Sequence, residues 1–190
     1  MSSFEFVFSL LVILLGLGLA EVLGGLASAV KRRPALSVGW GSGLLAAWVT
    51  SETVIFWQII WRARDALPGT STSLFAGFVV TGLYYFAGAM VFPDDLDRRT
   101  TLDDHFMQMK AKVVAAVLAA IGLSFLFRQL VLGQASWTLL TWFDWSSLAV
   151  IYALGPVVMF TERRRIAIGC LAMLVVLDVL EPVAEIIWPS

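Results

Sequence analysis

The chain has 190 residues, of which 59% are hydrophobic and 14% charged, and its formal net charge is -1. Soluble domains carry about 25% charged residues. At this length they still leave roughly a third of their unfolded-chain surface in water, which a chain this hydrophobic cannot cover with polar groups. The composition therefore indicates a membrane protein. One histidine and one cysteine exclude, within one chain, a disulfide framework, a zinc cluster and a bis-histidine haem site. The net charge excludes a basic surface for nucleic acid.

Six apolar segments are long enough to cross a bilayer, since a spanning helix needs about 20 mostly apolar residues. The predicted fold is therefore an all-α, polytopic bundle of six transmembrane helices that forms one domain over residues 1–190. The sixth segment is the least apolar. In chain order, the predicted spans are 4–30, 40–61, 73–92, 113–132, 137–160 and 166–188.

Small residues recur at every fourth position of the first span, and such a stripe allows helix backbones to approach closely. The stripe consists of Gly16, Ala20, Gly24 and Ser28. Two interpretations stay open, which are packing against another helix of the same chain and a seam between copies in a homo-oligomer. Glu21 lies beside the stripe and is expected to face protein.

Apolar residues at helical spacing precede the fourth span and predict that its helix begins near residue 102, as an amphipathic ramp along the inner membrane surface. These residues are Leu102, Phe106, Met109 and Val113. The aspartates at 94, 95, 97, 103 and 104 are interpreted as a solvated loop and a helix start, because no matching acidic motif stands elsewhere. No metal site and no cofactor are predicted.

The basic residues predict the orientation, because cytoplasmic loops retain lysine and arginine. With both chain ends on the outer, periplasmic side of a bacterial inner membrane, most basic residues fall in inner loops. These are Lys31, Arg32, Arg33, Arg98, Arg99, Lys110, Lys112, Arg163, Arg164 and Arg165.

Acidic residues inside the predicted spans are the main indication of function, since a charge at the bilayer centre costs at least about 2.5–3.5 kcal/mol. They are Glu21, Glu52, Asp178, Glu181 and Glu185. At about 1.5 Å per residue their depths rise from ~15 Å for Glu21 to ~30 Å for Glu185 above the inner boundary. The last three share one helix face, and Pro182 frees the carbonyl of Asp178. The set predicts an ion or proton path.

A structural role for these acids is the alternative. Arg128 lies at ~24 Å by the same rise per residue, level with Glu181, so the two are a possible salt bridge. Glu52 stands in a polar patch with Thr50, Ser51 and Thr53, where a hydrogen bond to a neighbouring helix is an equally simple role.

Two functions follow from these observations. The first is a small oligomeric channel or transporter for a cation or protons, and the second is a non-catalytic accessory or scaffolding subunit of a larger membrane complex. An intramembrane acid catalyst acting on a lipid or isoprenoid is a third, although no catalytic residue is predicted. The expected partners are the bilayer and either further copies or other membrane subunits, without nucleic acid.

Overall fold

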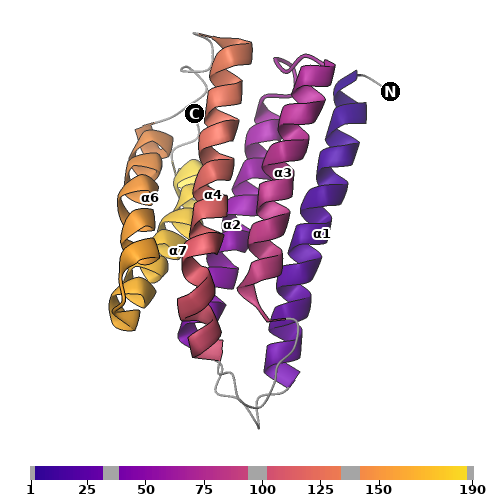
Figure 1. Ribbon diagram of the computed structural model, residues 1–190. Coiled ribbons are helices and arrows are strands. Elements are labelled where there is room, and N and C mark those ends of the chain that lie inside the picture. Colours follow the sequence, from indigo (N-terminus) through magenta and orange to yellow (C-terminus); the bar gives the residue numbers. More distant parts are fainter. Residues whose placement is uncertain (1–2, 32–38, 94–101, 134–141, 188–190) are drawn as a thin grey trace.

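The computed structural model describes residues 3–31, 39–93, 102–133 and 142–187, without the side chains of 3–4, 132, 142–143 and 181–187. The described residues form six α-helices and no strand (Figure 1). The helices are α1 (Ser3–Lys31), α2 (Trp40–Arg62), α3 (Ser71–Val91), α4 (Leu102–Leu132), α6 (Trp142–Phe160) and α7 (Arg164–Ile187).

The helices support the membrane assignment. Within the described ranges α1, α2, α3 and α4 are long and apolar enough to cross a bilayer, and α6 contains the shorter apolar stretch Asp144–Phe160. Large apolar side chains face outward, among them Phe75, Phe86 and Leu130 at 69%, 61% and 76% exposure. Lipid rather than water is the solvent that accepts such a surface. The count of six spans and the outward chain ends stay predictions.

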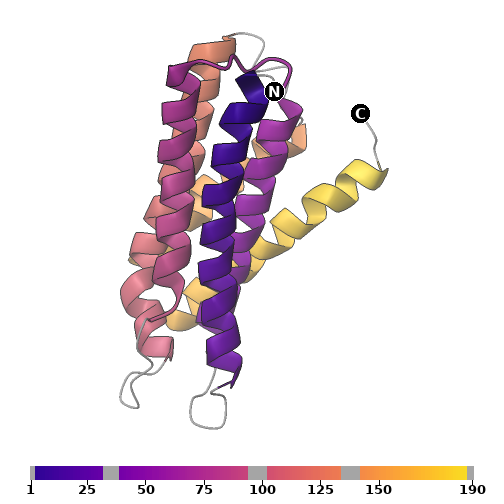
Figure 2. The ribbon, with the colours of Figure 1, turned by 90° about the vertical axis from the view of Figure 1, so that its right-hand side faces the viewer.

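The helices run alternately up and down, and α2 contacts four others: α1, α3, α4 and α7. The remaining contacts join α1 to α3, α3 to α4, α4 to α6 and α6 to α7. Figure 2 shows that α7 crosses the bundle obliquely and that its second half diverges from the other helices. Ser42, Glu52 and Thr53 of α2 are buried among these neighbours, whereas α7 meets α2 along only part of its length.

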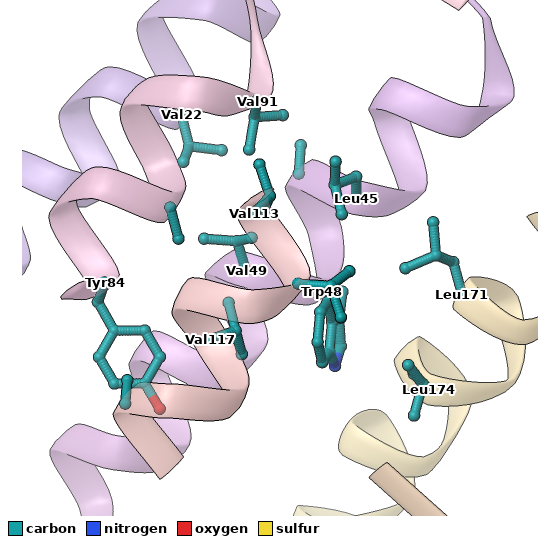
Figure 3. Packing of buried hydrophobic residues seen from close by; sticks show 14 of the residues in the cluster. Val22, Leu45, Trp48, Val49, Tyr84, Val91, Val113, Val117, Leu171 and Leu174 are labelled. Carbon is teal, nitrogen blue, oxygen red and sulfur yellow. The ribbon is translucent and has the colours of Figure 1, made fainter. Parts of the chain in front are cut away.

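One cluster of buried side chains joins the helices, and Figure 3 shows part of it. Trp48 of α2 is fully buried and belongs to this cluster together with Val113 and Val117 of α4 and Leu171 and Leu174 of α7. Because this core lies inside the bundle, each helix turns one apolar face inward and another outward.

Glycines set the close contact between α1 and α3. A Cβ added to Gly88 would lie 2.9 Å from the carbonyl oxygen of Gly18, and one added to Gly18 would lie 3.2 Å from the Cα of Tyr85. Small residues at this crossing let the two backbones touch. The face of α1 that packs inside the chain is therefore the one that carries Gly18 and Val22.

The small-residue stripe of the first span lies on the opposite, outer face of α1. Gly16, Ala20, Gly24 and Ser28 are all exposed, and a Cβ added at Gly16 or Gly24 would meet no atom within 4 Å. Among the described residues no helix of the same chain packs against the stripe, because the Gly18 face makes the contact with α3.

The fourth helix begins at Leu102, but its first turns do not lie on the membrane surface as predicted. Leu102, Phe106 and Val113 are at most 1% exposed. A Cβ added to Gly41 would lie 2.7 Å from the Phe106 ring, and Ser42 Oγ donates a hydrogen bond to the Leu102 carbonyl at 3.1 Å. The missing side chain at Gly41 makes room for Phe106, so the ramp packs into the bundle.

Lys110 joins the beginning of α4 to the end of α6. This buried side chain is 3% exposed. Its Nζ donates hydrogen bonds to the carbonyls of Val158, Met159 and Thr161 at 2.6, 3.1 and 2.8 Å. The Val157 carbonyl accepts from the backbone N–H of Thr161. The carbonyls at a helix end have no partners within the helix, and a cation there also meets the negative end of the helix dipole.

An ion pair ties the same end of the bundle. Arg164, at the start of α7, contacts Asp103, in the first turn of α4, with 2.6 Å between Nη2 and Oδ2. His105 Nε2 lies 3.2 Å from the carbonyl oxygen of Met90. The beginnings of α4 and α7 and the end of α3 are thus held together by polar contacts.

Candidate functional site

The polar patch of α2 places one carboxyl side chain inside the bundle. Glu52 is 3% exposed and Thr53 4% exposed. Thr53 Oγ1 donates to the Val49 carbonyl at 2.7 Å, which satisfies its hydroxyl within the helix. The longer Glu52 side chain reaches away from its own backbone and lines a cavity between the helices.

A second buried carboxyl group comes from α7. Asp178 is 6% exposed, and its Oδ2 accepts a hydrogen bond from the hydroxyl of Ser51. The oblique crossing of α7 over α2 brings together residues that lie 127 positions apart. Because Ser51 precedes Glu52 directly, the contact joins Asp178 to the polar patch of α2.

These residues belong to one cavity of about 80 Å³, which we call the acidic cavity. Carboxyl groups of Glu52, Asp144 and Asp178 line it, as does Arg128. Hydroxyl-bearing side chains complete the polar part of the wall, namely Tyr84, Ser124 and Ser147. A buried water needs about 10–15 Å³ and two to four polar partners. The acidic cavity therefore has room and partners for several water molecules.

The charges around the acidic cavity are unequal, since three carboxyl groups meet one guanidinium. Arg128 interacts electrostatically with Asp144, and its guanidinium carbon lies 5.6 Å from the centre of the Phe125 ring. Acidic groups therefore outnumber basic ones in the described lining, and burying them inside a membrane protein is costly.

The structure brings together some of the predicted path residues and separates others. Glu52, Asp178 and Arg128 line the same cavity. Glu21 does not, because its side chain is exposed on the outer face of α1, where no described helix of this chain covers it; that it faces protein stays a prediction. The side chains of Glu181 and Glu185 lie outside the described residues, as does the predicted pairing of Glu181 with Arg128.

Four polar residues of the acidic cavity are missing from the sequence-based path: Asp144, Tyr84, Ser124 and Ser147. Asp144 interacts with Arg128, and Tyr84 lies fully within the bundle at 3% exposure. The sequence signal for Asp144 was present, since a lone acid near the start of an apolar span meets the same criterion as Glu52. Tyr84 had no such signal, because a tyrosine in an apolar helix is common in packed cores.

Metal binding finds no support in the part of the chain that the structure describes, where no three or more histidine, cysteine, aspartate or glutamate side chains are grouped to hold an ion. Comparisons of the chain with protein family models, curated proteins and solved structures give no match. The chemistry of the acidic cavity is therefore the guide to function.

Proposed function

We propose that this chain is a small multi-pass protein of a bacterial inner membrane that moves protons or cations across the bilayer through the acidic cavity. The observation that carries the proposal is the burial of Glu52 of α2 and Asp178 of α7 against one cavity of about 80 Å³, which has room for several water molecules. Ionisable side chains inside a membrane protein are costly, and they commonly mark proton relays and ion pathways. The proposed path uses these two carboxyl groups as its central relay.

Helix lengths support six spans. At about 1.5 Å per residue, the 19 residues of α6 reach roughly 28 Å and the 24 residues of α7 roughly 36 Å, against a hydrocarbon core of about 30 Å. An even number of spans leaves both chain ends on one side. Most described basic residues lie toward the other side, which supports an inner location for it: these are Lys31, Lys110, Lys112, Arg163, Arg164 and Arg165, against Arg62, Arg64 and Arg128 toward the side of the chain ends.

The relay step needs only groups of the acidic cavity and the adjacent Ser51. A proton on the Asp178 carboxyl passes to Glu52 when an O–H bond forms on the receiving oxygen as the bond on the donor breaks. The Ser51 hydroxyl and cavity water are the bridging groups. Glu181 and Glu185 follow Asp178 along α7 at i+3 and i+7, and we propose that they continue the path toward the end of that helix.

The test is flux into liposomes that contain the purified full chain. Glu52→Gln and Asp178→Asn remove the ionisable groups while keeping the side-chain shapes, and we expect each to abolish the flux that the wild type shows when protons and alkali cations are both measured. Asp65→Asn is the matched control, because Asp65 is 87% exposed beyond the end of α2, and its flux should equal that of the wild type. Unchanged flux in the Glu52→Gln/Asp178→Asn double variant, with assembly intact, would overturn the proposal.

The outer face of α1 supports the second candidate function, an accessory or scaffolding subunit. Glu21 is exposed near the middle of α1, beside the exposed small residues Gly24 and Ser28, and it forms no hydrogen bond or ion pair with any described residue. A carboxyl group that faces hydrocarbon is costly, so a neighbouring helix that covers this face stabilises the protein. That helix belongs either to a second copy or to another membrane subunit.

Cysteine cross-linking distinguishes these partners. In a Cys170→Ser background, Gly24→Cys reports on the stripe, and Phe86→Cys, which is 61% exposed on α3, is the control. Disulfide-linked homodimers at position 24 and none at position 86 indicate a homo-oligomer. Links to other polypeptides, together with an absence of ion flux, favour the accessory subunit over the transporter.

A further inference from the structure

A second cavity of about 70 Å³ adjoins the acidic cavity, and we call it the apolar cavity. Its far wall contains Leu67, Pro68 and Gly69 of the connection between α2 and α3. Toward the bundle centre it shares wall residues with the acidic cavity, namely Phe56, Ile59, Ser124 and Arg128. The two cavities therefore follow one another from the α2–α3 connection to Glu52 and Asp178.

Arg128 carries the one positive charge in the described lining of either cavity. Its guanidinium is held over the Phe125 ring and interacts with Asp144. Its Nε is buried and has no hydrogen-bond partner among the described residues. Arginine keeps its charge under all ordinary conditions, so a fixed positive charge stands where the two cavities meet.

We propose that Arg128 is the selectivity-determining residue of this path, admitting protons and excluding alkali cations. The inference rests on the proposed function and names its substrate. Fixed positive groups beside a narrow path act as electrostatic barriers to cations, and their effect is large where little water screens them. An alkali cation keeps its full charge as it passes the guanidinium.

A proton avoids this cost because it travels on oxygen atoms. When it binds to a carboxylate such as Asp178, the product is a neutral acid, and the next transfer forms one O–H bond as another breaks. Ser124, which lines both cavities, and Ser147 supply hydroxyl groups near Arg128.

The sizes of the cavities act in the same direction. Volumes of about 70 and 80 Å³ hold only a few water molecules, and the wall of the apolar cavity is almost wholly apolar. An alkali cation must therefore leave most of its hydration shell before it meets oxygen ligands. A proton needs only a short chain of water and hydroxyl groups.

The experiment compares proton flux, followed with a pH-sensitive dye, with uptake of labelled sodium and potassium into liposomes that hold the full chain. We expect the wild type to conduct protons alone, and Arg128→Gln to raise alkali-cation uptake at least about tenfold, since one unit charge at close range is removed. Arg128→Lys keeps the charge and should keep the exclusion. Arg64→Gln is the matched control, because Arg64 is exposed and lines neither cavity.

The outcomes separate the two proposals. Proton flux in the wild type, with alkali-cation uptake in Arg128→Gln no higher than in the wild type, overturns the role of Arg128 and leaves the proposed function in place. Wild-type uptake of sodium or potassium at the rate of protons also overturns that role alone. Absence of both proton and alkali-cation flux from the wild type overturns the proposed function and the selectivity role together. Should Arg128→Gln fail to fold, Arg128→Met, which keeps the aliphatic stem, is measured in the same way.

Discussion

Replacement of Lys110 by methionine should lower the free energy of unfolding by about 3 kcal/mol. The ammonium donates to three carbonyls at 2.6, 2.8 and 3.1 Å, and hydrogen bonds to charged groups each contribute about 1.5–3 kcal/mol. Bonds that share one nitrogen are not additive, so the expected loss is smaller than their sum. The favourable interaction of the cation with the end of the α6 dipole is lost as well, at about 0.3–1 kcal/mol.

Thermal unfolding in detergent micelles, followed by tryptophan fluorescence, measures this change. For a chain of this length about 3 kcal/mol corresponds to a fall in Tm of roughly 6–12 °C. Lys112→Met is the matched control, since Lys112 lies on the same helix but is exposed, and a surface substitution changes stability by less than about 0.5 kcal/mol. Equal Tm values for Lys110→Met and the wild type, or equal losses in both variants, would refute the role given to the Lys110 ammonium.

Three further outcomes are expected in the same unfolding assay. Gly88→Val should lower the free energy of unfolding by more than about 2 kcal/mol, because a Cβ there would lie 2.9 Å from a backbone oxygen of α1. Gly82→Val is the control and should lower it by under about 1 kcal/mol, since a Cβ there would meet no atom within 4 Å. Similar losses in the two variants would contradict the close helix contact. In a double-mutant cycle, Asp103→Asn and Arg164→Gln should show a coupling of about 0.5–1 kcal/mol, given their partial exposure, and zero coupling would dismiss the ion pair. Thr70→Ala should cost about 1 kcal/mol, because Thr70 Oγ1 accepts from the Ser73 N–H at the start of α3, and an unchanged Tm would count against this cap.

Hydropathy in the sequence predicted the helices well because charged residues mark where apolar runs end. The predicted spans 4–30 and 40–61 match α1, Ser3–Lys31, and α2, Trp40–Arg62, within one residue at each end. Hydropathy could not predict which apolar face meets protein. The first turns of α4 have the same apolar pattern whether lipid headgroups or other helices cover them. The space that Gly41 leaves for Phe106 lets these turns pack against α2 inside the bundle.

The candidate site was predictable in its composition and not in its geometry. Burial of Glu52 and Asp178 follows from the cost of charge in a bilayer. Their convergence depends on the oblique path of α7, for which the sequence contains no signal. Glu21 met the same criterion as they did, but helix periodicity alone could not show that α1 would turn a different face toward α3.

Several polar contacts between helices gather at the end where α4 begins, and this distribution has a kinetic consequence. Ser42, Asp103 and Lys110 fasten that end, whereas the acidic and apolar cavities lie in the opposite half. Local opening events have free energies that follow the density of such contacts. In hydrogen-exchange experiments the amides around Phe106 should therefore exchange more slowly than those around the α2–α3 connection. The helices should separate transiently at the end that holds the two cavities, while they stay packed at the end where α4 begins.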